Sequence, residues 1–460
     1  MSVALLLLSV IGGLAAASFW LARRSALAAS SGAVRLHSLP GHYGWYAALW
    51  TAIPGLLVTC AWLAVAPGWL ESATLAGVPQ ASLPADPAQR ELFSNDVRNI
   101  ARGDIASESA DDTARAAADR YVALQGRALR GALALTLLLG IGGAVTGLRR
   151  VRPELAARAR VESVLRLALA GSSGLAILVT VGIVLSLVFE TLRFFEAVPV
   201  SEFLFGTHWS PQTALRADQV GSSGSFGAVP VFAGTLLITG IAMLVAVPIG
   251  LLSAISMTFY ASARARDVAK PLLEILAGVP TVVYGFFAAL VVAPAVRDAG
   301  AGLGLSVASE SALAAGLVMG IMIVPFVSSL SDDAITAVPI ALRDGSYALG
   351  ATRSETIRQV MLPAALPGIA GGVMLAISRA IGETMIVVMA AGLAANLTLD
   401  PLEAVTTVTV QIVTLLTGDQ EFDSAKTLAA FALGLALFLV TLALNVAALR
   451  IVKRYREMYD

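Results

Sequence analysis

The stretch from Asp344 to Pro363 reads DGSYALGATRSETIRQVMLP and separates two long apolar segments. Its charged and hydroxyl side chains, together with Gly345 and Gly350, predict a short, turn-rich helical segment outside the hydrocarbon layer. Such a segment in a membrane protein indicates a docking surface for a soluble partner. The alternative is an ordinary polar connection between two helices, in which Asp344 lies near a helix start where its charge is favourable.

The composition around this stretch is that of an integral membrane protein. Of the 460 residues, 57% are hydrophobic and 13% are charged, and the mean hydropathy is +0.81. A soluble globular protein is far less apolar. The formal charge of zero carries no information about partners, so the positions of the charges matter more than their sum. We expect membrane lipid, and no nucleic acid, among the partners.

About nine apolar segments are long enough to cross a bilayer as helices, since a span needs about 20 residues. Prolines and glycines inside them are tolerated where neighbouring helices satisfy the freed backbone groups. The fold class predicted is therefore all-α and polytopic. The segments centre on 3–22, 45–67, 129–148, 167–189, 231–258, 272–296, 311–330, 367–392 and 428–449.

The basic residues predict the orientation. They gather in the loops that lie inside if the N-terminus is outside, including the Arg149–Arg166 loop, the Arg264–Lys270 loop and the C-terminal tail. The positive-inside rule then places the N-terminus outside and both the C-terminus and the Asp344–Pro363 stretch in the cytoplasm. The first segment has its arginines after the apolar run, which favours a retained anchor over a cleaved signal peptide.

Two regions are expected. Residues 1–160 form an N-terminal extension with about three transmembrane helices and an outer, extracytoplasmic stretch at about 69–128. That stretch mixes Pro, Asp, Ala and Arg, which is compatible with a small helical cap or with a partly disordered loop. Residues 161–460 form a six-helix core with a cytoplasmic loop at about 331–365.

Four motifs of the core carry a resemblance to a known family. They are GSSGSFGAVP at Gly221–Pro230, followed by the Gly234, Ile241 and Pro248 positions, LAGVPTVVYGF at Leu276–Phe286, SRAIGETM at Ser378–Met385, and the Asp344–Pro363 stretch. Together they resemble the permease subunits of phosphate ABC transporters, and the continuation after the SRAIGETM motif is similar to the PstC subunits rather than to the sister PstA subunits.

The resemblance implies a type I, MetI-like ABC importer core in the bacterial inner membrane. It implies a permease that forms the pathway with a second, PstA-like permease, receives phosphate from a PstS-like extracytoplasmic binding protein and is driven by a PstB-like ATPase dimer. ATP and Mg²⁺ would then be held by the ATPase, and no cofactor by this chain.

In the family, the polar loop forms a short coupling helix that fits a groove on the ATPase. The corresponding segment here is Ile335–Tyr347, with Gly350 permitting a close turn. The usual Glu-Ala-Ala is replaced at its start. The positions that match the coupling pattern are Asp344, Gly345, Ser346, Gly350, Leu362 and Pro363.

Arg379 and Glu383 lie well inside an apolar segment. Their four-residue spacing predicts one helical face and an ion pair. An Arg at the centre of a membrane helix costs about 2.5–3.5 kcal/mol on insertion scales, so it should face an internal polar route. The guanidinium suits phosphate oxygens, and Ser378 and Thr384 could add hydroxyl contacts. The alternative is an ion pair that only holds this helix to its neighbours; the resemblance favours phosphate passage.

The chain lacks the signals of an enzyme. None of its three lysines follows a glycine as a phosphate-binding loop of the Walker type requires, its three histidines show no metal-ligand spacing, and no catalytic constellation is present. We expect a transporter, with energy supplied by another subunit. The rival functions are a permease for another oxyanion, such as molybdate or sulfate, and a gradient-driven secondary transporter, which commonly has internal repeats that are not evident here.

Overall fold

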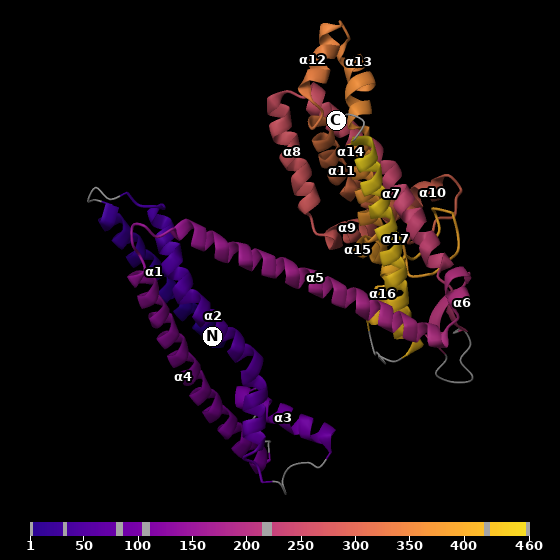
Figure 1. The fold of residues 1–460 in the computed structure, drawn as a ribbon. Helices are drawn as coiled ribbons and strands as arrows, with labels where there is room; N and C mark the ends of the chain where they lie inside the picture. The colour runs from indigo at the N-terminus through magenta and orange to yellow at the C-terminus, as the bar shows by residue number, and fades with distance from the viewer. Residues whose placement is uncertain are drawn as a thin grey trace. The chain divides into compact units, whose positions relative to one another are not determined.

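The computed structural model describes residues 3–30, 35–79, 86–103, 111–213, 223–417 and 424–456. Most of these residues lie in helices, and the chain divides into two compact units, an N-terminal unit Met1–Ile177 and a C-terminal unit Leu178–Asp460 (Figure 1). The division falls inside one long helix, α5 (Ala157–Ala197). Each unit has its own apolar clusters.

Three long helices pack side by side in the N-terminal unit (Figure 1). Small residues let two of them approach closely, as is usual between helices in membranes: a Cβ added at Gly143 would lie 2.0 Å from the carbonyl oxygen of Trp50. The Thr51 hydroxyl donates to the Ser18 hydroxyl over 2.9 Å and joins the remaining helix to this pair. The three helices are α1 (Val3–Ser30), α2 (Pro40–Leu75) and α4 (Asp112–Arg149).

The predicted outer stretch at 69–128 contains helical structure. The helix α3 (Pro87–Arg102) packs on the first turns of α4, where Val97, Ala117 and Ala118 form a small buried cluster. Residues 80–85 and 104–110 lie outside the described residues. The described portion therefore agrees with a helical cap.

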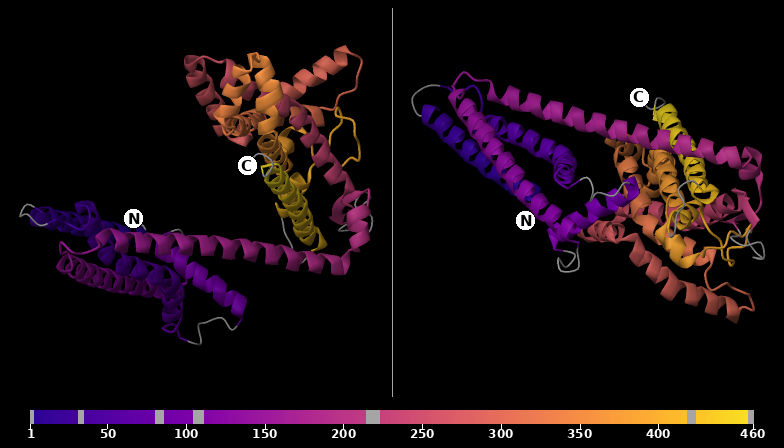
Figure 2. Two further views of the ribbon diagram at one scale, coloured as in Figure 1. Left: turned by 45° about the horizontal axis from the view of Figure 1, so that its top comes forward. Right: turned by 90° about the horizontal axis from the view of Figure 1, so that it is seen from below.

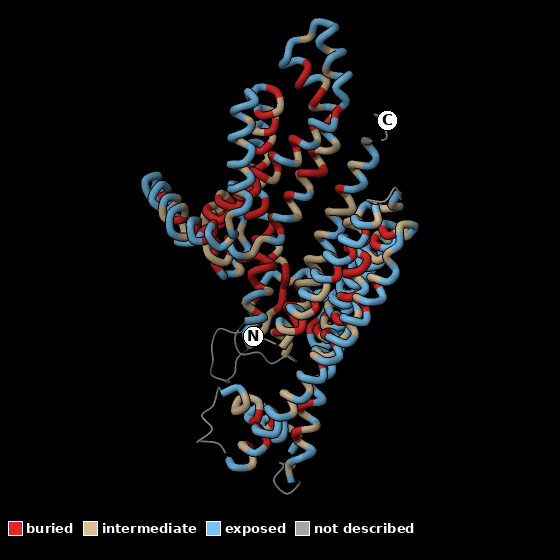
Figure 3. Tube along the Cα trace, turned by 90° about the vertical axis from the view of Figure 1, so that its left-hand side faces the viewer, coloured by how far each residue is buried: buried red, intermediate tan, exposed pale blue. Residues whose placement is uncertain are grey.

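The C-terminal unit is organised around α7 (Val229–Ile255) and α11 (Ala312–Thr336), which lie side by side (Figure 2). Most of α11 is buried, and the buried positions run through the middle of this unit (Figure 3). Gly316 and Gly320 make this possible, since a Cβ at Gly320 would meet the Ala242 carbonyl oxygen at 3.0 Å. The backbone of α7 can therefore lie close to α11, because the glycines of α11 place no side chain between the two helices.

The other elements of this unit surround that pair. They are α6 (Val200–Phe205), η3 (Ser256–Tyr260), α8 (Ala263–Gly278), α9 (Thr281–Phe287), η4 (Ala288–Val292), α10 (Ala293–Gly302), α12 (Ile340–Ala348), α13 (Arg353–Glu355), η5 (Thr356–Met361), α14 (Leu362–Ile381), α15 (Met385–Ala390), α16 (Val408–Leu416) and α17 (Ala425–Arg456).

One hairpin interrupts the helices. The strands β1 (Trp209–Thr213) and β2 (Ser223–Phe226) are antiparallel, with Trp209 opposite Phe226. Their aromatic rings pack with Phe194 of α5 and Phe203 of α6 into one buried cluster. Gly221 and Ser222, which open the first family motif, lie outside the described residues.

The prediction of nine spans is confirmed for the described residues, where nine helices are long and apolar enough to cross a membrane. Two predicted spans were wrong in their limits. The sixth, 272–296, is divided at Val279 and Pro280, so that 272–278 belong to α8 and the spanning helix begins at Thr281. The eighth, 367–392, begins earlier and stops at Ile381, because Gly382–Thr384 leave the helical conformation.

Candidate functional site

Arg379 lies in the last turn of α14, with its side chain exposed in the isolated subunit. Its guanidinium carbon is 5.9 Å from the centre of the Phe326 ring on α11, a distance at which a cation is attracted to a ring face. The helix α14 packs against α11 and α17. The guanidinium is therefore held at the edge of the helix bundle, within reach of the space between α8, α11 and α14.

The predicted ion pair between Arg379 and Glu383 is absent from the described residues, and the prediction of one shared helical face was wrong. The helix α14 ends at Ile381, so the two residues lie on opposite sides of a break. The Glu383 carboxylate instead accepts the backbone N–H of Met385 over 3.1 Å and caps the first turn of α15. The four-residue spacing implies a contact only while the helix continues, and here it does not.

The two neighbouring hydroxyl groups are occupied within the fold. Ser378 Oγ donates to Asn445 Oδ1 of α17 over 3.0 Å, and Thr384 Oγ1 makes a long contact of 3.4 Å with the Gly382 carbonyl oxygen. The predicted pathway residues therefore surround one helix break but have different partners. Only Arg379 among them lines the cavity described next.

A cavity of about 290 Å³ lies between η3, α8, α11 and α14. Its wall is apolar over most of its area, yet it brings together two cations, two carboxylates and two hydroxyls from three helices. These groups belong to Arg379, Lys270, Glu274, Asp332, Ser328 and Ser329. Glu274 is thus a wall residue of the same space as Arg379.

Ser328 is the most informative of these residues. It is fully buried on α11, and its hydroxyl has no hydrogen-bond partner among the described residues. A buried polar group without a partner is unfavourable by about 1–3 kcal/mol and is uncommon in native proteins. Ser328 lies in the cavity wall with none of its surface exposed, so a ligand in the cavity reaches the hydroxyl only when neighbouring side chains move.

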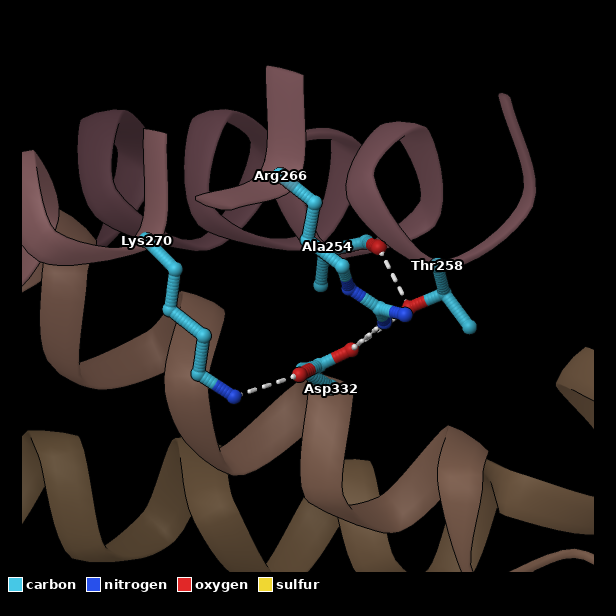
Figure 4. A network of polar contacts seen from close by, with 5 residues as sticks. All are labelled: Ala254, Thr258, Arg266, Lys270 and Asp332. Atoms are coloured by element: carbon cyan, nitrogen blue, oxygen red, sulfur yellow. Dashed lines mark hydrogen bonds and ion pairs between the residues drawn. The ribbon is translucent and has the colours of Figure 1, made fainter. Parts of the chain in front are cut away.

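Asp332 anchors a polar network at one end of the cavity (Figure 4). One carboxylate oxygen accepts from the Thr258 hydroxyl over 2.6 Å and from Arg266 over 3.2 Å, and the other accepts from Lys270 Nζ over 3.2 Å. Thr258 also donates to the Ala254 carbonyl oxygen over 2.8 Å. The network joins α8 to α11 and to the end of α7.

The polar wall continues beyond the cavity. A second recess is lined by Arg266, Asp267 and Asp333, and it shares Lys270, Glu274 and Asp332 with the first. Both recesses lie toward the ends of α8 and α11 that the positive-inside rule assigns to the cytoplasm. Neither Asp332 nor Ser328 was identified from the sequence, although an acidic pair directly after an apolar segment was a visible signal.

The predicted coupling segment forms a separate helix, α12, with its limits shifted. Ile335 belongs to α11, and α12 begins only at Ile340 after Pro339. Asp344 and Gly345 lie in the middle of α12, which excludes the alternative that Asp344 stands at a helix start; Asp344 contacts Arg343 over 3.3 Å.

The turn after α12 is tight. Gly350 has a φ of 86°, in the left-handed region that favours glycine, and so permits the close turn predicted there. Ser346 is hydrogen-bonded to Thr356 over 2.9 Å, and Thr352 with Glu355 forms a capping box at the start of the next helix.

No residue of α12 is buried, and it lies in the exposed region at the top of Figure 3. Leu362 and Pro363 stand at the start of α14, and the stretch Arg353–Ile381 is one spanning helix. The helix that carries Arg379 therefore begins directly after the coupling segment.

Comparison with known families divides the chain in a similar way. Residues 5–179 match a family described as phosphate ATP-binding cassette transporter, and residues 246–457 match the binding-protein-dependent transport system inner membrane component family. The second match agrees with the ABC importer core predicted from the motifs, and the first covers nearly all of the N-terminal unit.

Three relatives have a similar sequence over most of their length. The probable ABC transporter permease protein YqgH of Bacillus subtilis is 35% identical, over 52% of this chain and 74% of its own. The phosphate transport system permease protein PstC 1 of Mycobacterium bovis is 31% identical, over 55% and 81%. PstC of Pasteurella multocida is 30% identical, over 60% and 87%. The chain therefore belongs to the PstC family of phosphate transport system permease proteins.

Proposed function

We propose that the chain is the transmembrane permease subunit of an ATP-driven importer of inorganic phosphate, and that the anion passes through the cavity beside Arg379. The observation that carries the proposal is the cavity wall, which brings Arg379 and Lys270 to one space inside an apolar bundle, with the unpartnered Ser328 hydroxyl buried in the same wall. Ionisable groups at membrane depth mark substrate routes. Membership of the PstC family supports phosphate as the transported ion.

The groups on the wall suit a phosphate ion in transit. The Arg379 guanidinium presents forked donors to two phosphate oxygens, and the Lys270 ammonium adds a point charge. Glu274 and Asp332 lie on the same wall and reduce the net positive field. A site in a pathway must bind well enough to admit the ion and weakly enough to release it, so a mixed set of charges fits passage better than storage.

The coupling segment supports an external motor. The helix α12 exposes Ile340, Leu342 and Tyr347, and the exposed Leu349 follows directly after it, so that a soluble subunit could cover these apolar side chains. After the turn at Gly350, one continuous helix, Arg353–Ile381, runs from the end of that segment to Arg379. Movement of α12 by an ATPase dimer would therefore shift the residue that meets the anion, as alternating access requires.

The rest of the assembly follows from this function. A second permease completes the pathway, a phosphate-binding protein delivers the ion from outside, and the ATPase subunits hold ATP and Mg²⁺. The site residues of this chain are Arg379, Lys270, Ser328 and Glu274 in the pathway, and α12 with Gly350 in coupling. We place the protein in the bacterial inner membrane with its N-terminus outside and C-terminus in the cytoplasm.

The test is phosphate uptake by the assembled complex in proteoliposomes with ATP enclosed on the ATPase side. Uptake should require ATP hydrolysis, persist when proton and sodium gradients are dissipated, and be unaffected by excess sulfate or molybdate. Competition by either anion would indicate the other-oxyanion permease. Uptake without ATP, driven by an ion gradient, would indicate a secondary transporter and contradict the proposal.

A further inference from the structure

A second lined space lies in the N-terminal unit, apart from the phosphate pathway. It is a groove of about 440 Å³ between α2 and the first turns of α5. Five of its residues, Leu49, Trp50, Ile53, Pro54 and Val164, form an apolar wall, and Arg160, Ser163 and Tyr46 supply the polar groups. Next to the groove, Ala157 and Val161 of α5 pack with Tyr43 and Tyr46 of α2 in a buried cluster.

Two polar groups of the groove have no hydrogen-bond or ion-pair partner among the described side chains. Tyr46 is 4% exposed, and its hydroxyl has no hydrogen-bond partner among the described residues. The Arg160 guanidinium lies 6.0 Å from the Tyr46 ring centre and makes no ion pair with a described carboxylate. Its neighbour Arg158, in contrast, is paired with Glu162 over 2.6 Å. The groove therefore holds a buried donor and an uncompensated cation side by side.

Along α2, the polar groups come first and the apolar residues follow, which matches the headgroup and the acyl chain of an amphiphilic molecule. Tyr46 comes first, near the end of the helix that the arginines mark as cytoplasmic, and Ile53 and Pro54 follow about 10 Å deeper at 1.5 Å per residue. The guanidinium carbon of Arg150 lies 4.7 Å from the centre of the ring of Trp50, a wall residue of the groove. A headgroup would meet the charges and an acyl chain would cover the apolar wall.

We propose that this groove binds an anionic phospholipid of the inner leaflet, with its phosphate on Arg160 and the Tyr46 hydroxyl. Basic pockets between helices on the cytoplasmic side are suited to anionic headgroups, and the apolar wall explains why a lipid, and not a free phosphate ion, is the ligand. The site is separate from Arg379, so it bears on lipid dependence and not on the transported ion.

The experiment measures lipid binding to the full-length protein, assembled with its partner permease and delipidated, by native mass spectrometry with short-chain phosphatidylglycerol and phosphatidylcholine. Wild-type protein should prefer phosphatidylglycerol. Arg160→Gln should weaken its binding about tenfold or more, since a charge-assisted hydrogen bond contributes about 1.5–3 kcal/mol. Tyr46→Phe, which keeps the ring packing, should weaken binding about threefold.

The matched control is Arg158→Gln, which removes the same charge two residues away but from a side chain paired outside the groove. It should leave binding unchanged, and excess inorganic phosphate should not compete. Val164→Trp should displace the lipid whatever its headgroup, by filling the groove. Equal binding by the Arg160 and Arg158 variants, equal binding of the two lipids, or a protein helix occupying the groove in the assembled complex would overturn the proposal. None of these outcomes depends on phosphate transport.

Discussion

At the scale of single residues, the proposed phosphate route depends on a few cavity side chains. Among the described residues, the Arg379 guanidinium lies near an aromatic ring and forms no ion pair, and the Ser328 hydroxyl has no hydrogen-bond partner. Asp332, in contrast, is surrounded by three donors. Groups left without partners are available to a passing ion, whereas saturated groups hold the structure.

Replacing Arg379 tests the anion contact directly. Arg379→Gln should reduce phosphate uptake by about 10- to 100-fold with the complex still assembled, because it removes a charge-assisted hydrogen bond of about 1.5–3 kcal/mol. The control is Arg297→Gln on α10, whose guanidinium faces Asp298 outside the cavity. Normal uptake by the Arg379 variant would remove the residue from the pathway.

The Ser328 hydroxyl separates binding from stability. Ser328→Ala should raise the KM for phosphate uptake about three- to tenfold, yet leave the free energy of unfolding unchanged or raised by about 1 kcal/mol, because the buried hydroxyl has no partner to lose. Ser331→Ala, one turn away and also buried, should leave KM unchanged. Uptake kinetics and denaturant unfolding in detergent measure the two effects. A loss of stability without a change in KM would assign Ser328 to packing.

At the scale of elements, α8 and α11 are joined by one carboxylate and two cations. Arg266 and Lys270 remain about half exposed, so the contact is weaker than a fully buried pair. Its geometry still contributes to the position of α8, because no residue of α8 is fully buried and only Leu276 packs on the hydrophobic core. The cavity wall formed by Lys270 and Glu274 therefore depends on Asp332.

Neutralising that carboxylate should loosen α8. Asp332→Asn should lower the free energy of unfolding by about 1–3 kcal/mol, since two cations then face each other without a counterion. Asp333→Asn changes the same charge at an exposed neighbour, and its effect should stay within about 0.5 kcal/mol. Thermal unfolding in detergent measures both variants. Equal effects would mean that the network makes no specific contribution.

At the scale of the whole molecule, the coupling role proposed for α12 requires an assembly. Exposed apolar side chains are unfavourable in an isolated chain, and covering them is favourable by about 25 cal/mol per Å² of apolar area removed from water. Such side chains lie on α12 and directly after it, outside the nine described helices that are long and apolar enough to cross a membrane. The proposed function therefore predicts a partner that covers α12.

Leu349 tests that partner. It is 91% exposed, so Leu349→Asp should leave the stability of the isolated chain unchanged and greatly reduce co-purification of the ATPase subunit. Leu303→Asp provides a matched control, because Leu303 is 77% exposed at the end of α10, away from the coupling segment. Unchanged ATPase recovery with the Leu349 variant would exclude α12 as the docking surface.

Sequence alone was enough to predict the membrane class, the nine spans and the polar segment Asp344–Pro363, in which α12 ends, because hydropathy and glycine punctuation act locally along the chain. It identified Arg379 for the same reason, as a charge inside an apolar run. Only the tertiary structure decided that Glu383 caps α15, that Ser328 is unpartnered, and that Asp332 binds α8. These three findings depend on the residue at which a helix ends or on contacts between groups more than 50 residues apart. A local sequence pattern encodes neither the helix end nor such contacts.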